Sequence, residues 1–389
     1  MKSFAVISAL ATIAAAGPIL GSRTIQKRAA ITEACNIGYA EGTTGGAGGV
    51  TTTVGSLAEF TAVAEAEEPA VIVVDGAITG AYRVRVKSNK SIIGLPGASF
   101  TNVGLYINKA ENVIVRNLKF SKVEASVGDA IGIQEATKVW VDHVDVSSDL
   151  ESGKDFYDGL IDITRASDFV TISNSFIHDH FKASLIGHSD SNAAQDTGKL
   201  HVTYANNYWK NTNSRNPSVR FGTAHIFNNI FEDIGATGVN TRMGAKVLIE
   251  STSFSGASNP IVSRDSKTEG TANIKDVIGA DLGTVKEGDF TSVPYQYELL
   301  GSANVAAVTR SAGQTLTFDG SVSAPAPAPE QPVESTPVEQ PSPVESSPVE
   351  EAAPTETAPV AEDEEIEETC TRRRVKKAKK SLIAKMLRL

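Results

Sequence analysis

Six short runs with strand-like alternation recur along the middle of this chain, and their recurrence constrains the fold more than any other feature. Each run is rich in Val, Ile, Phe and Tyr. The runs are NVIVRNLKF, KVWVDHVDV, FVTISNSFI, HVTYANNYW, AHIFNNIF and KVLIESTSF. We take as equivalent one residue near the middle of each run: Asn117, His143, Asn174, Asn206, Asn229 and Ser251. The successive intervals are then 26, 31, 32, 23 and 22 residues.

A period in the low twenties, with insertions, is typical of stacked coils that each bury an apolar face against the next coil. Asparagine at four of the six positions suits an internal hydrogen-bonding ladder. A β-sandwich would also contain many short strands, but Asn-Gly and Asp-Gly hairpin signals are sparse here. The sequence therefore predicts an all-β fold, a right-handed parallel β-helix. The two longest intervals, between His143 and Asn206, predict enlarged loops that form an active-site cleft.

The first 28 residues have the layout of export and processing signals. Lys2 is followed by an apolar run and then by small residues, as in a secretory signal peptide. The apolar run is too short to span a bilayer. We predict a signal peptide at 1–16 and a propeptide at 17–28, which ends in the dibasic pair Lys27-Arg28. The product is expected to be secreted and extracellular.

The composition changes at about Ser321, where Pro, Glu, Ser and Val dominate and PVE repeats. Such a segment has too little apolar surface to fold. We predict a β-helix domain at 29–320, a disordered linker at 321–369 and a basic tail at 370–389. The RRRVKKAKK of the tail either binds an acidic polymer or pairs with the EDEEIEE that precedes it.

Charge and cysteine content narrow the partners and the means of stabilisation. The formal net charge of −10 argues against nucleic acid or an anionic membrane as the main partner. With Cys35 and Cys370 as its two cysteines, a secreted product is not held by a disulfide framework. A bridge between these two cysteines is left open, and stability is expected to come from packing and hydrogen bonds.

Three acidic and three basic residues stand out near strand ends in the long coils. The acids are Asp129, Asp158 and Asp162, and the bases are Lys182, Arg215 and Arg220. Stacked strands lie about 4.8 Å apart, so these side chains can share one patch. Converging carboxylates raise one another's pKa and need a cation, and oxygen-only ligands favour calcium. The residues alone leave open that Asp158 and Asp162 merely end turns, because their spacing matches no EF-hand loop.

Several motifs occur in a specific order along the chain: EGTTGGAGGVTTTVGSLAEF, WVDH, DGLIDI, VTISNSFIHDHFKASLIGHSD and RNPSVRFG. Together they resemble the successive signatures of polysaccharide lyase family 1, the extracellular pectate lyases, of the fungal type. The similarity runs from roughly Tyr39 to Gly313. The resemblance implies a parallel β-helix that uses Ca²⁺ to cleave α-1,4-linked polygalacturonate by β-elimination, in the degradation of plant cell-wall pectin.

The resemblance also implies roles for single residues. Asp129, Asp158 and Asp162 resemble the calcium-binding carboxylates. Lys182 and Arg220 resemble the substrate-holding bases, and Arg215 resembles the residue that takes the proton. Some family members carry a further acid two residues before the first aspartate, where this chain has Val127. We expect a monomer that acts on polygalacturonate, with neither nucleic acid nor a membrane as partner.

The chemistry of elimination agrees with such a site. Removing the C5 proton of a uronate builds negative charge beside a carboxylate, and calcium and cationic side chains stabilise that charge. Arginine is protonated at neutral pH, so an arginine base favours an alkaline optimum. His143 is taken as structural.

Two other functions are weighed against this one. A pectin lyase that acts on methyl-esterified chains without calcium is disfavoured by Asp158 and Asp162. A non-catalytic polysaccharide-binding β-helix is disfavoured by the set Lys182, Arg215 and Arg220.

Overall fold

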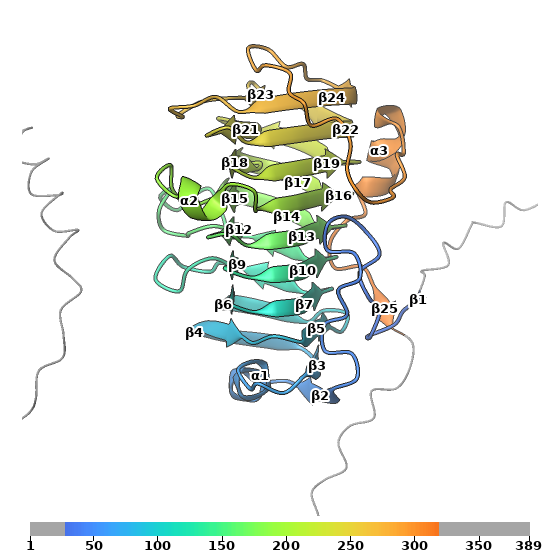
Figure 1. The fold of residues 1–389 in the computed structure, drawn as a ribbon. Coiled ribbons are helices and arrows are strands. Elements are labelled where there is room, and N and C mark those ends of the chain that lie inside the picture. Colours follow the sequence, from blue (N-terminus) through green and yellow to red (C-terminus); the bar gives the residue numbers. More distant parts are fainter. Residues whose placement is uncertain (1–27, 319–389) are drawn as a thin grey trace, which may run out of the picture. The chain divides into compact units, whose positions relative to one another are not determined.

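The computed structural model describes residues 28–318, which form one long stack of parallel strands (Figure 1). The predicted all-β parallel β-helix is thereby confirmed. The predicted signal peptide, linker and basic tail, all but the last residue of the predicted propeptide, and Cys370 lie outside the described residues. None of the helices within residues 28–318 is long and apolar enough to cross a membrane.

The strands pair in three parallel ladders, and each coil passes through ladder B, then ladder C, then ladder A. Ladder A contains the short strands β9 (Ile131–Gln134), β12 (Ile161–Thr164), β15 (Leu185–Ile186), β18 (Ser218–Arg220), β21 (Val239–Arg242) and β23 (Ile261–Val262). Ladder B contains β2 (Val50–Val54), β3 (Ala70–Val74), β5 (Lys90–Gly94), β7 (Glu111–Arg116), β10 (Thr137–Asp142), β13 (Asp168–Ser173), β16 (His201–Ala205) and β19 (Thr223–Phe227).

Ladder C contains β8 (Lys119–Ser121), β11 (Asp145–Ser147), β14 (Phe176–Lys182), β17 (Tyr208–Ser214) and β20 (Ile230–Ile234). Near the two ends of the stack, longer strands bend from one ladder into the next: β4 (Ala77–Val86), β6 (Ser99–Asn108), β22 (Lys246–Ser255) and β24 (Thr271–Ile278). A separate pair joins β1 (Arg28–Ala29) to β25 (Thr317–Phe318).

The helices lie at the margins of the stack (Figure 1). Helix α1 (Leu57–Ala64) begins at a capping box, in which Ser56 and Glu59 satisfy each other's backbone N–H groups, and it buries Phe60 at the N-terminal end of the coils. Helix α2 (Ala193–Asp196) lies in the long loop between β15 and β16. Helix α3 (Ser302–Thr309) packs Val305 against Tyr208 and Ile230 of ladder C.

The interior of the stack is apolar, as alternation along the strands predicts. One inward-facing row of ladder C runs along the axis through Phe100, Phe120, Val146, Ile177, Trp209, Phe231 and Phe254. Phe231 stacks on Phe254 with ring centroids 4.5 Å apart and planes only 7° from parallel. The row joins neighbouring coils through direct side-chain contact, in addition to their backbone hydrogen bonds.

The predicted asparagine ladder lies at the corner between ladder B and ladder C, with one correction. Asn174, Asn206 and Asn228 take the left-handed backbone conformation there, and their amides bond in series at 3.2 and 3.1 Å. The sequence interpretation placed Asn229 in this ladder, which was wrong by one residue. Asn229 belongs to a second, fully buried row, where its Oδ1 accepts from the backbone N–H of Asn207.

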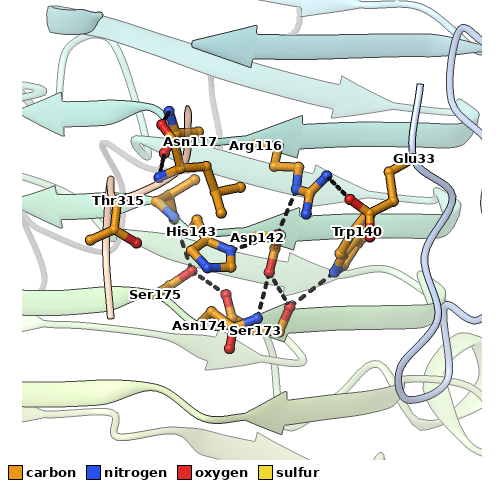
Figure 2. Close-up of polar contacts among 12 residues, drawn as sticks. Glu33, Arg116, Asn117, Trp140, Asp142, His143, Ser173, Asn174, Ser175 and Thr315 are labelled. Carbon is orange, nitrogen blue, oxygen red and sulfur yellow. Dashed lines mark hydrogen bonds and ion pairs between the residues drawn. The ribbon is translucent and has the colours of Figure 1, made fainter. Parts of the chain in front are cut away.

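A buried polar cluster surrounds Asp142 at the same corner (Figure 2). This Asp142 cluster consists of Glu33, Arg116, Trp140, Asp142, His143, Ser173 and Asn174. The Asp142 carboxylate accepts from Arg116 Nε, His143 Nδ1 and Ser173 Oγ, each at 2.7 Å, and from Asn174 Nδ2 at 2.8 Å. Burial alone would raise the pKa of Asp142, but His143, Arg116 and Asn174 together lower it to about 2.

Two residues discussed from the sequence, His143 and Cys35, lie in or near this cluster. His143 contacts Asp142 within the cluster, which agrees with the structural role assigned to it. Cys35 is a buried free cysteine in the part of the chain that the structure describes, and burial raises the pKa of its thiol to about 12. Its thiol donates to the carbonyl of Ile37 at 3.2 Å.

Candidate active site

Most of the predicted site residues gather where the chain passes from ladder C to ladder A, a region we call the C–A corner. In successive coils the corner is formed by residues 122–130, 148–160, 183–184 and 215–217. Asp129 precedes β9, Asp158 precedes β12, Lys182 ends β14 and Arg215 follows β17. Because the coils are in register, these residues lie one above another on the same edge of the stack.

Asp129 and Asp162 approach each other across Gly159. Gly159 donates its backbone N–H to Asp129 Oδ1 at 2.9 Å, and Leu185 donates its N–H to Asp162 Oδ1 at 3.0 Å. A Cβ at position 159 would lie 2.7 Å from Asp129 Oδ1 and 2.6 Å from Asp162 Oδ1. Any residue larger than glycine would therefore press on both carboxylates.

These two carboxyl groups are costly to ionise together. Burial, followed by the nearby charge of Asp158, raises the pKa of Asp129 to about 6. Burial and the charge of Asp129 raise the pKa of Asp162 well above its ordinary value, although Arg215 acts in the opposite direction. Both groups would be ionised more easily if a cation stood beside them.

Asp158 lies close to this pair but is bound to a lysine. Lys182, whose side chain is only 8% exposed, places Nζ 3.5 Å from Asp158 Oδ1 and 3.1 Å from Asp155 Oδ1. Its hydrogen bond lowers the pKa of Asp155. Buried His180 donates Nε2–H to the carbonyl of Asp158 at 2.8 Å, and burial lowers the pKa of His180 to about 4. Neutral His180 thus positions the backbone at Asp158.

Arg215 lies at the C–A corner beside Asp162. Its NH1 lies 3.9 Å from Asp162 Oδ2, and its side chain is 32% exposed. Its backbone φ of +62° is in the left-handed region, which residues other than glycine rarely adopt. Many other non-glycine residues at the bends of this stack share that conformation, among them Asn174 and Asn206, so it reflects the geometry of the coil.

Arg220 is not brought into contact with the other five residues. It ends β18 on the far side of the short ladder A strand, where its Nε donates to Asp190 Oδ1 at 2.6 Å and its NH1 to the carbonyl of Gly187 at 2.9 Å. Arg242, its register partner in the next coil, places NH2 3.4 Å from the same Asp190 oxygen. Burial and the charge of Arg220 lower the pKa of Arg242.

The carboxylate oxygens of Asp129, Asp158 and Asp162 are ligands of the type that a hard cation prefers, but only part of the set is arranged to bind one. Asp129 and Asp162 each have one oxygen fixed by a backbone N–H, while Oδ2 of Asp129 has no hydrogen-bond partner among the described residues. Asp158 faces Lys182 in this conformation, and no three acidic, His or Cys side chains within residues 28–318 converge on one point. Val127 is buried in the core and supplies no oxygen ligand from its side chain.

Sequence reasoning missed Asp155, Asp190 and Arg242 and did not find the contact of His180 with Asp158. Arg242 lies 22 residues after Arg220, which is one coil of the repeat, so counting coils could have found it. Asp155 and Asp190 lie in loops outside the repeat, and no periodic signal marks them.

Comparison with known proteins gives one consistent answer. The family described as pectate lyase matches residues 6–315. Pectate lyase B of Colletotrichum gloeosporioides is 62% identical over 76% of this chain and 90% of that protein. The probable pectate lyase B of Aspergillus flavus is 54% identical over 81% of this chain and all of that protein.

A solved structure is similar as well. The pectate lyase of Bacillus sp. N165, in complex with trigalacturonate, superposes with a TM-score of 0.65 at 30% identity. The likeness covers 71% of this chain and 98% of that chain. From its sequence, its coils and these relatives, the chain belongs to the pectate lyase family.

Proposed function

We propose that this protein cleaves polygalacturonate by calcium-dependent β-elimination outside the cell. The observation that carries the proposal is the C–A corner, where two buried carboxylates, Lys182 and Arg215 are brought together in a chain of the pectate lyase family. An anionic uronate chain needs local positive charge, and this acidic protein places it at one edge of the stack. The similar Bacillus enzyme was solved with trigalacturonate.

Asp129, Asp162 and Asp158 are the residues proposed to hold calcium. The space above Gly159 and the raised pKa of both flanking aspartates support this assignment. Asp158 would turn from Lys182 towards the ion, and Lys182, then paired with the exposed Asp155 alone, could exchange that partner for a substrate carboxylate. When bound, calcium would supply positive charge that offsets the charge developing on the uronate.

Arg215 is proposed to take the proton from C5 of the uronate. The C5–H bonding electrons then form the C4–C5 double bond, the bond between C4 and the glycosidic oxygen breaks, and the leaving oxygen takes up a proton. Lys182 would hold the substrate carboxylate during this step, and Arg220 would bind a neighbouring uronate from the far end of β18. Since free arginine is protonated at neutral pH, the rate should climb towards alkaline pH.

The ultraviolet absorbance of the unsaturated product tests the function directly. We expect product from polygalacturonate with calcium, little after calcium is removed by a chelator, and less from highly methyl-esterified pectin. Equal rates on the esterified substrate without calcium would identify a pectin lyase instead. No absorbance change on either substrate would leave a polysaccharide-binding protein.

Substitutions at Arg215 and Arg220 test the roles of the arginines. Arg215→Lys keeps the charge but displaces the basic nitrogen, so kcat should fall by about two orders of magnitude or more while KM changes little. Arg220→Lys should mainly raise KM. Arg310→Lys, at a half-exposed ion pair with Glu232 on ladder C, is the matched control and should leave both constants unchanged. Near-normal kcat in Arg215→Lys would move the base to Lys182.

Substitution of Asp162 tests the metal site. Asp162→Ala should weaken calcium binding in calorimetry and lower activity, with partial rescue by excess calcium, while the circular dichroism spectrum stays that of the wild type. Asp281→Ala, at an exposed position, serves as control. Wild-type affinity for calcium in the Asp162 variant would remove this residue from the ligand set.

We also propose export after cleavage of residues 1–16 and removal of residues 17–28, and action as a monomer. The order of charged, apolar and small residues at the start of the chain supports export. N-terminal sequencing of the protein from culture medium should begin at Ala29, and light scattering should give the mass of one chain.

A further inference from the structure

A groove with aromatic walls lies on the outer face of ladder B, a different face from the C–A corner. Its floor is a row of residues in successive coils. His201, Thr223 and Lys246 are register partners, and Phe169 directly precedes Val170, the partner of Val202. Tyr39 from the N-terminal segment closes one part, and Asp289, Phe290 and Pro294 from the C-terminal segment close another. The groove has a volume of about 370 Å³, within the range of small-molecule sites.

Phe169 is a large apolar residue that lies exposed on the outer face of ladder B. Its side chain is 41% exposed, although phenylalanine is normally buried. Its φ of +54° is in the left-handed region, which is unfavourable for a bulky residue. Its ring lies parallel to that of His201, within 11° and with centroids 5.8 Å apart. Asn112 and Lys138, at the same position in the two preceding coils, share this backbone conformation, so the coil geometry accounts for it. Packing in the core does not account for the exposure of Phe169.

The polar groups of the groove are arranged for hydrogen bonding. His201 Nδ1 bonds Asp168 Oδ1 at 2.7 Å, which fixes the ring. Among the described residues, neither His201 Nε2 nor the Thr223 hydroxyl has a partner, and both residues are partly exposed. Each can therefore bond a ligand hydroxyl without breaking an internal contact.

The charged groups of the groove are already paired with one another. Lys246 Nζ lies 2.8 Å from Asp289 Oδ1, and Asp168 is bound by His201 and lies 3.8 Å from Lys199. No unpaired positive charge is left among these groups for an acidic ligand. Aromatic walls, free hydrogen-bonding groups and balanced charge together suit a ring that has an apolar C–H face and several hydroxyl groups.

We propose that this groove is a second carbohydrate site, which binds a neutral pyranose unit of a wall polysaccharide. It would hold the enzyme on polymer that the C–A corner does not cut, so that cutting and attachment are served by different faces of the β-helix. The choice of carbohydrate as the ligand class rests on the proposed function, but binding at this groove can be measured without catalysis.

Saturation-transfer NMR and calorimetry with β-1,4-galactotetraose and cellotetraose as neutral probes test the proposal. We expect the wild type to bind at least one of them with millimolar or better affinity. Phe169→Ala should weaken that binding about two- to tenfold, the effect of losing one aromatic contact, and Thr223→Val should weaken it as well. Turnover on soluble polygalacturonate should stay within about twofold of the wild type in both variants. Val308→Ala, at an exposed apolar residue of α3, should change neither quantity.

Two results would overturn the proposal. The first is that neither neutral probe binds at a concentration of about 10 mM, ten times the weakest dissociation constant that we expect. The second is binding that survives in the Phe169→Ala, Thr223→Val double variant. Tetragalacturonate, tested on an Arg215→Lys background, should compete weakly with the neutral probe; equal or stronger competition would show that the groove takes acidic sugars and would refute its neutral specificity. These outcomes are independent of whether polygalacturonate is cleaved.

Discussion

Two buried aspartates of the same coil, Asp142 and Asp162, meet opposite electrostatic environments. Asp142 is fully buried and accepts hydrogen bonds from four side chains, two of them from Arg116 and His143, and its pKa falls to about 2. Asp162 is nearly as buried, receives one backbone N–H and faces Asp129, and its pKa rises. The first carboxylate is satisfied by the protein, whereas the second has only Arg215, 3.9 Å away, to offset its burial and the charge of Asp129.

The difference separates a carboxylate whose charge the protein already compensates from one that can still bind a cation. Burial disfavours the ionised form of both carboxyl groups. The number and charge of their hydrogen-bond donors therefore decide which protonation state is favoured. A buried carboxylate whose negative charge is not compensated by the protein gains more from binding an external cation. The predictions below test this distinction, from the largest expected change to the smallest.

Removal of the satisfied carboxylate should have the largest effect on stability. Asp142→Ala leaves Arg116 buried with one partner fewer and leaves Ser173 and Asn174 without their acceptor, so the free energy of unfolding should fall by about 3–5 kcal/mol. Urea denaturation measures the change, and Asp281→Ala at an exposed site is the control. A loss below about 1 kcal/mol would mean that water replaces the carboxylate at no cost.

Stability should also depend on pH differently at the two sites. The pKa of Asp142 is lowered to about 2, so its contribution of about 2–3 kcal/mol is present above pH 4 and is lost as pH falls through 2. The pKa of Asp129 is raised to about 6, so in calcium-free protein the folded state keeps a proton that the unfolded chain releases between about pH 4 and 6. The free energy of unfolding should therefore decline as pH rises through that window.

Chemical denaturation of dialysed, calcium-free protein between pH 3 and 8 tests both parts. Adding calcium should restore stability most strongly at neutral pH and least at pH 4, where the carboxyl groups bind protons instead. A decline from pH 4 to 6 that calcium does not reverse would argue against Asp129 as part of the cation site.

Loss of a single donor from the Asp142 cluster should cost less than loss of its acceptor. Asn174→Ala removes the amide that bonds Asp142 Oδ1 and that accepts from Asn206. The unfolding free energy should drop by about 1.5 kcal/mol, the lower end for a bond to a charged group, because three other donors remain. Asn304→Ala, at an exposed position, should have no measurable effect. A drop as large as that of Asp142→Ala would show that the cluster acts as one unit.

Neutralising the unsatisfied carboxylate should change stability least, and with the opposite sign. Asp162→Asn relieves its repulsion with Asp129, so calcium-free protein at neutral pH should be stabilised by up to about 1 kcal/mol. With saturating calcium the wild type should become the more stable of the two. Thermal unfolding with and without calcium gives both values, and a destabilised variant in calcium-free buffer would contradict the comparison.

The sequence was sufficient to predict the repeating coils, but not to place every residue at its exact position within a coil. Alternation and a period near 22 residues predicted the parallel coils, because each coil must bury the same face. Two adjacent asparagines, Asn228 and Asn229, both fit the pattern, and only the hydrogen bonds distinguish the corner position from the buried row. Periodicity alone cannot resolve a choice between neighbouring residues of one type.

For the site, motif resemblance selected Asp129, Asp162, Lys182 and Arg215, which the fold gathers at one corner. It did not indicate that Asp158 pairs with Lys182 or that Arg220 lies apart with Asp190. Those contacts depend on loops of irregular length, whose paths follow from packing against the stack rather than from the repeat. The groove around Phe169 was missed for a similar reason, since its walls come from both ends of the domain.

Helix α1, at the first coil, bears on how separate molecules can associate. Stacked coils that end in unpaired backbone N–H and C=O groups can add further strands, including those of another molecule. Helix α1 packs its buried face, with Phe60 and Ala64, against the N-terminal coils (Figure 1). By packing against the first strands, α1 limits the access of a foreign strand to this end of the stack, so the long, regular β-helix need not grow by strand addition as an amyloid fibre does.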